Sequence, residues 1–158
     1  MKVDIYVASE NLQPKRQDRW SGYIIRAEGS KREAAHADLT HSTANQSVIM
    51  NIIAALDRFT RPAEITIHID SDFVLGKVVR PVEDGKEKTS VLEHWQETGW
   101  RTTRKTEVKN RNDWQRLYNK LRVFEQSGGT FSFVKMEQDD EMRDRILRTI
   151  GKAMTQEG

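Results

Sequence analysis

The chain has 158 residues, of which 36% are hydrophobic and 32% carry a formal charge, with a net charge of only +2. This length suits one domain with its own core, so we expect residues 1–158 to form a single domain. The lack of cysteine excludes disulfides and thiolate metal sites. Because the sequence has neither a signal-peptide pattern nor a run of roughly 18 apolar residues, we expect a cytoplasmic protein without a membrane partner.

The first half of the chain predicts three strands, a helix and a fourth strand. Apolar residues alternate over residues 1–9, and residues 20–27 and 32–39 have the composition of further strands. Residues 42–59 begin with a Ser-Thr capping signal and continue with apolar residues at helical spacing. Residues 64–70 (EITIHID) alternate again, with three isoleucines on one side.

The second half predicts short helices, a basic segment, a final strand and a final helix. Residues 71–79 and 92–98 are predicted as short helices joined by a charged connector. Residues 112–126 are amphipathic, residues 130–136 predict the fifth strand, and residues 139–154 predict the last helix. This order indicates an α/β fold: a mixed five-stranded sheet, its first three strands antiparallel, covered by helices on both faces.

The charges are distributed unevenly along the chain. Residues 101–122 hold eight Lys and Arg against two acids, whereas residues 137–144 hold five acids against one Arg. A basic segment beside an acidic one suits a metal-dependent nuclease, in which cations contact phosphates and acids hold a metal. Two solvated helix faces of opposite charge would give the same pattern, so the charges alone leave both interpretations open.

Four motifs occur in order along the chain. They are STANQSVIMNIIAAL at residues 42–56, IDSDFV at 69–74, HWQETGWRTTRKTEVKNRNDWQRL at 94–117 and FSFVKMEQDDEMRDRIL at 131–147. Together they resemble a cellular type 1 ribonuclease H over nearly the whole chain. The third motif is the most specific, because it is similar to the basic protrusion of that family, here about residues 92–111.

The resemblance implies the ribonuclease H-like fold and the family's chemistry. That chemistry is hydrolysis of the RNA strand in an RNA–DNA hybrid, with two Mg²⁺ (or Mn²⁺) ions held by a cluster of carboxylates. Two catalytic, metal-binding acids carry over: Asp70 at the end of a strand and Asp144 one turn into the last helix. Alternatively, Asp70 is the N-cap of the next helix, and Asp144 forms a surface ion pair with Arg148.

The other two acids of the family pattern are missing. Ala8 and Val48 stand at their positions, and neither side chain can bind a cation. Glu10 is a candidate substitute, because it lies two residues after Ala8 on the same side of an extended strand. Glu137 is a second one, at the place where the family often has a loop histidine. We therefore expect that the fold is retained and that hydrolysis is lost or strongly reduced.

The residues that the resemblance assigns to duplex binding are better kept. Backbone amides at a helix start suit a phosphate, and interleaved aromatic and basic residues suit a nucleic-acid backbone. Trp100, within the protrusion, is predicted to be exposed, whereas Trp114, just after it, is predicted to pack in the core. The expected nucleic-acid-binding residues are Thr43, Asn45, Trp95, Trp100, Arg101, Arg104, Lys105, Lys109 and Asn110.

Three hypotheses of function follow. The sequence favours a monomeric ribonuclease H-like protein that binds an RNA–DNA hybrid or a related duplex with little or no cleavage. The second hypothesis is an active ribonuclease H whose rearranged site adds Glu10 and Glu137 to Asp70 and Asp144. The third is a protein-interaction module that keeps only the fold, because a fold does not dictate a function.

Overall fold

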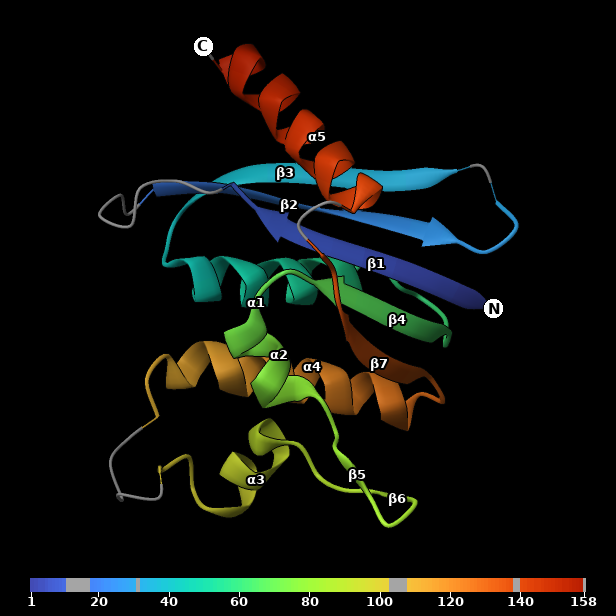
Figure 1. Cartoon of the computed structure of the whole chain (residues 1–158), viewed down its shortest axis with the longest axis vertical. Coiled ribbons are helices and arrows are strands. Elements are labelled where there is room, and N and C mark those ends of the chain that lie inside the picture. Colours follow the sequence, from blue (N-terminus) through green and yellow to red (C-terminus); the bar gives the residue numbers. More distant parts are fainter. Residues whose placement is uncertain (11–17, 31, 103–107, 138–139, 158) are drawn as a thin grey trace.

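The computed structural model describes residues 1–10, 18–30, 32–102, 108–137 and 140–157 (Figure 1). A five-stranded sheet with the order β3-β2-β1-β4-β7 lies at its centre. The first three strands are antiparallel, β4 runs parallel to β1, and β7 runs parallel to β4, which confirms the predicted mixed sheet. The strands are β1 (Lys2–Ser9), β2 (Asp18–Ala27), β3 (Glu33–His41), β4 (Glu64–Ile69) and β7 (Thr130–Lys135).

Helices cover both faces of this sheet, as predicted. The helices α1 and α4 share the hydrophobic core of one face, whereas α5 crosses β1, β2 and β3 on the other (Figure 1). No helix in the described part of the chain has the length and apolar character needed to cross a membrane. The helices are α1 (Ala44–Leu56), α2 (Asp72–Val78), α3 (Val91–Glu97), α4 (Arg111–Gln126) and α5 (Glu141–Glu157).

The alternation of side chains along β1 produces two separate apolar clusters. Val3, Ile5 and Val7 pack with α1 and α4, whereas Tyr6 and Ala8 point to the opposite face and pack under α5. This follows from the two-residue period of a strand, which sends successive side chains to opposite faces. The position of a residue along β1 therefore decides on which face of the sheet its side chain lies.

The start of α1 is fixed by a capping box. The Thr43 hydroxyl accepts a hydrogen bond from the Gln46 amide at 3.2 Å, and the Gln46 side chain accepts one from the Thr43 amide at 3.0 Å. The helix ends three residues before the predicted residue Phe59. That ring still packs on the core, edge-on to Phe124 with centroids 6.2 Å apart, so its apolar spacing reflects burial rather than helix.

The charged connector after α2 contains a hairpin that the sequence did not predict. Its strands, β5 (Val82–Glu83) and β6 (Lys86–Glu87), have two residues each. Between them, Asp84 and Gly85 have φ angles of 52° and 75°. An Asp-Gly pair favours this left-handed two-residue turn, but strands this short show no alternation.

Candidate carboxylate site and nucleic-acid interface

The carboxyl ends of β1 and β4 lie at the same edge of the sheet because the two strands are parallel. The helices α1 and α4 both begin on this side of the molecule (Figure 1). Asp70 directly follows β4, and the residue after it, Ser71, is the N-cap of α2. Asp70 is therefore placed at this edge by the strand, and the alternative prediction that it caps the helix is wrong.

The carboxylate of Asp70 contacts a guanidinium group. The Nε of Arg143 lies 3.3 Å from the Oδ2 of Asp70, and the two side chains are only 9% and 13% exposed. Lys135 donates to the Asp70 carbonyl oxygen at 3.0 Å and pairs with Asp72 at 2.9 Å. Burial raises the pKa of Asp70, and the hydrogen bond and charge of Arg143 oppose this shift only in part. Two basic side chains thus contact Asp70, one at its carbonyl oxygen and one at its carboxylate.

Asp144 follows Arg143 on α5, but its side chain is exposed. Consecutive residues of an α-helix point about 100° apart, so a helix that directs Arg143 towards Asp70 turns Asp144 to a different side. Arg143 was not among the predicted site residues, because the rotation of the last helix about its axis was unknown.

The two candidate substitutes, Glu10 and Glu137, lie in surroundings that differ from those of Asp70. The Oε1 of Glu10 accepts a hydrogen bond from the Trp20 amide at 3.0 Å, and the Glu10 amide donates to the Trp20 carbonyl at 3.1 Å. Glu10 therefore continues the pairing of β1 with β2. Glu137 is exposed between β7 and α5.

The two positions without an acid are part of the apolar packing. Ala8 is fully buried in the cluster under α5, and Val48 is 2% exposed in the cluster on the opposite face. No group of three His, Cys, Asp or Glu among the described residues is placed to hold a metal ion. Since Mg²⁺ requires oxygen ligands and a two-ion site requires a carboxylate that positions both ions, the residues that the structure describes do not fit the metal pair that the resemblance implies.

Hydrogen bonds connect the start of α1 to its neighbours on both sides. The Ser71 hydroxyl donates to the Oδ1 of Asn45 at 3.3 Å, beside Asp70. The Gln46 side chain donates to Asp113 at the start of α4, at 3.1 Å. The predicted phosphate-binding residues of α1 therefore lie between the carboxylate site and the base of the protrusion, with Thr43 exposed and Asn45 half-buried.

The predicted exposure of Trp100 is wrong, because its side chain is only 4% exposed. Gly99 and Trp100 both have left-handed φ angles, 72° and 65°, which reverse the chain after α3. The Trp100 amide then donates to the Trp95 carbonyl at 2.7 Å, and its ring packs edge-on to Tyr118 with centroids 6.1 Å apart. Trp114 is 1% exposed, so its predicted place in the core is confirmed.

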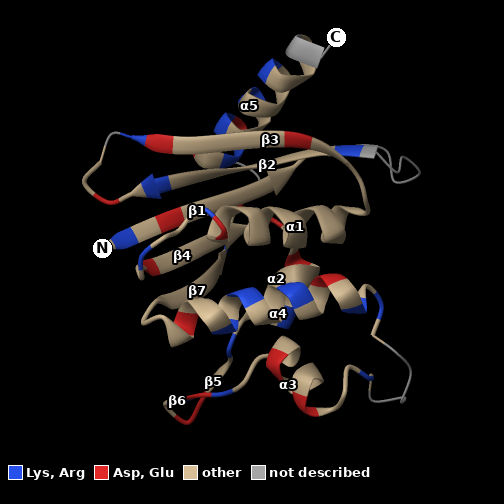
Figure 2. Ribbon diagram, turned by 180° about the vertical axis from the view of Figure 1, so that it is seen from behind, with Lys and Arg blue, Asp and Glu red and all other residues tan. Residues whose placement is uncertain are grey.

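The cations of the protrusion are partly described. Arg101 and Lys109 are exposed, and Asn110 precedes α4 as its N-cap residue in a left-handed conformation. Arg104 and Lys105 lie outside the described residues. Figure 2 shows further Lys and Arg residues along α4, whereas α1 carries no charged residue.

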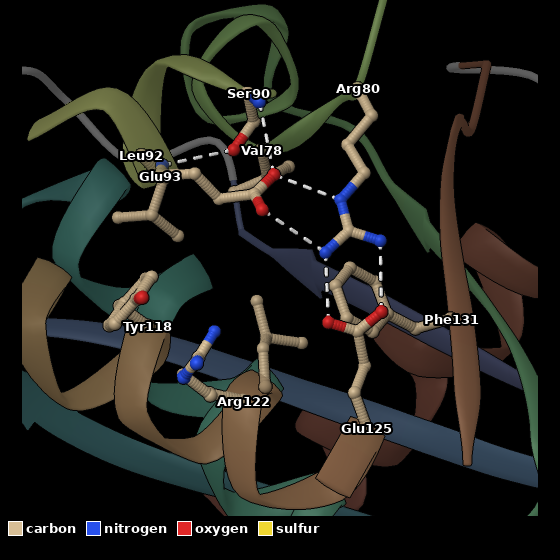
Figure 3. A pocket seen from close by; sticks show the side chains of 10 residues that line it. Val78, Arg80, Ser90, Leu92, Glu93, Tyr118, Arg122, Glu125 and Phe131 are labelled. Atoms are coloured by element: carbon tan, nitrogen blue, oxygen red, sulfur yellow. Dashed lines mark hydrogen bonds and ion pairs between the residues drawn. The ribbon is translucent and has the colours of Figure 1, made fainter. Parts of the chain in front are cut away.

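An ion-pair network that the sequence did not predict fastens α3 to α4. In Figure 3 the guanidinium of Arg80 lies between the carboxylates of Glu93 on α3 and Glu125 on α4. Its nitrogens lie 2.9 and 3.2 Å from Glu93 and 2.9 and 2.8 Å from Glu125, and the group sits 4.8 Å above the Phe131 ring. Burial opposes the charged form of Glu93, but the hydrogen bonds from Arg80 and Ser90 outweigh it and lower the pKa of this carboxyl. The three charged residues are far apart in sequence, so no local pattern marks them.

Comparisons with known proteins agree with this fold. The family model RNase H matches residues 2–136. The ribonuclease H of Bordetella pertussis is 34% identical over 96 residues, which cover 61% of this chain and 55% of that protein. The ribonuclease H of Rhodospirillum rubrum is 32% identical over 128 residues, covering 78% and 70%. The match thus spans little more than half of the Bordetella protein.

Solved structures show the same fold at low sequence identity. One is LC9-RNase H1, a type 1 RNase H with the type 2 active-site motif, with a TM-score of 0.65 and 12% identity over 99% of this chain and 74% of that one. Another is the foamy viral protease-reverse transcriptase in complex with an RNA/DNA hybrid, with a TM-score of 0.61 and 14% identity over 92% of this chain and 18% of that one. With the family model spanning most of the sequence, the chain belongs to the ribonuclease H family.

Proposed function

We propose that this chain binds an RNA–DNA hybrid, or another duplex of similar shape, without efficient cleavage. The observation that carries the proposal is the ion pair of Asp70 with Arg143, which places a cationic side chain against the acid that a two-metal nuclease would use for magnesium. The apolar packing of Ala8 and Val48 supports it, because neither position supplies an oxygen ligand.

Support for duplex binding comes from the surface that joins α1 to the protrusion. The exposed side chains of Thr43, Arg101 and Lys109 belong to this surface, and the hydrogen bond of Gln46 with Asp113 holds its two parts together. Cations of this kind contact phosphates, and an RNA–DNA hybrid is recognised by its shape and 2′-hydroxyl groups rather than by its sequence. The foamy viral relative was solved with such a hybrid, which makes it the first ligand to test.

The test combines binding and cleavage of a labelled hybrid, with double-stranded DNA and RNA of the same sequence as comparisons. Fluorescence anisotropy is expected to show binding of the hybrid that weakens steeply as salt rises, because bound phosphates release counterions. Gel analysis with Mg²⁺ is expected to show intact RNA. Binding that is absent or insensitive to salt would favour the protein-interaction module. Cleavage lost in both Glu10→Gln and Asp70→Asn would favour the active enzyme with a rearranged site.

A further inference from the structure

We infer that the guanidinium of Arg143 takes the place of a divalent cation beside Asp70, so that duplex binding by this chain needs no divalent metal. This inference rests on the proposed function and adds a property to it. The chain supplies the countercharge itself, as a fixed part of α5.

The geometry that carries this inference is a buried, one-to-one ion pair. Arg143 and Asp70 are both nearly enclosed, at 9% and 13% exposure, with 3.3 Å between Nε and Oδ2. The first turn of α5 holds Arg143 in place, because its amide donates to the Asp140 carbonyl at 3.1 Å. An arginine side chain stays charged at any pH at which the protein is folded, so this countercharge is permanent.

A divalent cation would have to displace this guanidinium from the Asp70 carboxylate. If Arg143 stayed, a metal ion and a guanidinium would lie side by side at one acid and repel each other. If Arg143 moved away, its buried charge would lose its partner, which is unfavourable in an enclosed position. Neither arrangement offers a metal the several oxygen ligands that it requires.

Among the described residues, the charged side chains that contact one another around Asp70 balance without a metal. Lys135 pairs with Asp72 at 2.9 Å and donates to the Asp70 carbonyl, so this edge holds two acids and two basic side chains in contact. A site of unpaired carboxylates would repel the phosphates of an approaching duplex. This balanced site does not, so a phosphate backbone can approach it without a bridging cation.

Binding of the metal alone is tested first, without any nucleic acid. Mn²⁺ is titrated into the isotope-labelled chain, and the broadening of each backbone amide signal in the NMR spectrum is measured. We expect Asp70, Ser71 and Arg143 to broaden no more than exposed acids such as Glu83 and Asp84 on the hairpin. Selective broadening around Asp70 at low Mn²⁺ would overturn the inference, and this result does not depend on duplex binding.

Duplex affinity is then measured in EDTA and in Mg²⁺, with KCl used to match the ionic strength. We expect the dissociation constant of the hybrid to differ by less than about twofold between the two conditions, because a specific bridging ion would change it far more. Binding that appears only with Mg²⁺ would overturn the inference while leaving the proposed function intact. Absence of binding in both conditions would instead overturn the proposed function.

Variants of Arg143 and Asp70 distinguish the effect of the Arg143 charge on duplex affinity from the effect of its packing. Arg143→Gln is expected to weaken hybrid binding in EDTA at least threefold, because the Asp70 carboxylate then faces the phosphates unpaired. The double variant Asp70→Asn with Arg143→Gln removes both charges and should recover most of that affinity. Arg145→Gln is the matched control, since it removes one cation from the same helix, where Arg145 pairs with Glu33, and should have a smaller effect.

If Arg143→Gln fails to fold, the double variant still tests the inference, because the double variant leaves no unpaired carboxylate at position 70. Equal affinity of Arg143→Gln and the native chain in EDTA would count against the inference. Failure of the double variant to recover affinity, when it is folded, would also count against it.

Discussion

Single side chains determine what the edge of the sheet can do. Ala8 is fully buried between β1 and α5, and Arg143 contacts the one acid that follows β4. Restoring an acid at position 8 would therefore place a charge in an apolar cluster rather than complete a metal site.

We predict that Ala8→Asp is less stable than Ala8→Asn at neutral pH, by about 1–3 kcal/mol, because the two side chains have similar size but only Asp carries a charge to be buried. The difference should shrink as the pH falls towards about 4, because the buried carboxyl is protonated at a higher pH than the same carboxyl in the unfolded chain, whose pKa is about 3.9. Urea denaturation of both variants across pH measures it. Equal stability at neutral pH, together with Mn²⁺ binding by the Asp variant, would show that position 8 still accepts a metal ligand.

The buried side chain of Trp100 is expected to stabilise the fold rather than to contact the duplex. Because this side chain is 4% exposed and packs on Trp95 and Tyr118, Trp100→Ala should destabilise the fold by about 3–5 kcal/mol. Trp100→Phe should keep most of the stability and bind the hybrid like the native chain. A large loss of affinity in a stable Trp100→Phe protein would instead indicate direct contact of the indole with the duplex.

The packing of helix α3 against helix α4 depends on Arg80. Arg80 is held by carboxylates from two helices, so removing it leaves Glu93 and Glu125 close together and half-buried. We predict that Arg80→Gln lowers the free energy of unfolding by about 1–3 kcal/mol and speeds amide hydrogen exchange in α3. Arg122→Gln is the control, because Arg122 is a second cation that lines the small pocket beside Arg80, Glu93 and Glu125. Unchanged exchange in α3 would mean that the network does not hold the protrusion in place.

The same network predicts a dependence on pH. The pKa of Glu93 is lowered in the folded chain from its ordinary 4.5, so its ion pair contributes stability above that pH and the contribution is lost as pH falls through the folded value. The pKa of Asp70 is raised in the folded chain, so Asp70 instead contributes stability at low pH that is lost as the pH rises. The native chain should therefore lose stability below about pH 4.5 relative to Glu93→Gln. Parallel curves for the two proteins across this range would contradict the prediction.

Elements with many alternating or periodic residues were predictable, and those fixed by long-range contacts were not. The strand β4 and helix α4 follow from their apolar spacing, whereas β5 and β6 are too short to show any.

In the site, Asp70 was located because a strand end fixes its position. Its partner Arg143 was not located, because the rotation of α5 is set by packing on the sheet. The inward turn of Trp100 depends on two left-handed residues, of which the sequence marks only the glycine.

The described cations of the protrusion lie near the start of α4, on the opposite side of α3 from the hairpin (Figures 1 and 2). If the protrusion contacts phosphates, Lys109→Ala should reduce the slope of log affinity against log salt by about 1. Lys86→Ala, on the hairpin, removes the same charge and should leave the slope unchanged. Equal slopes for both variants would place the duplex elsewhere.

We propose that the chain keeps the duplex-binding surface of its family while its carboxylate site holds no metal ions. The most direct measurement is a single-turnover assay in which hybrid bound by excess protein is incubated with Mg²⁺, and the bound fraction and RNA products are followed in the same sample. We predict full binding and intact RNA, with Asp70→Asn behaving like the native chain. Mg²⁺-dependent RNA products in the native sample that disappear in Asp70→Asn would contradict the claim.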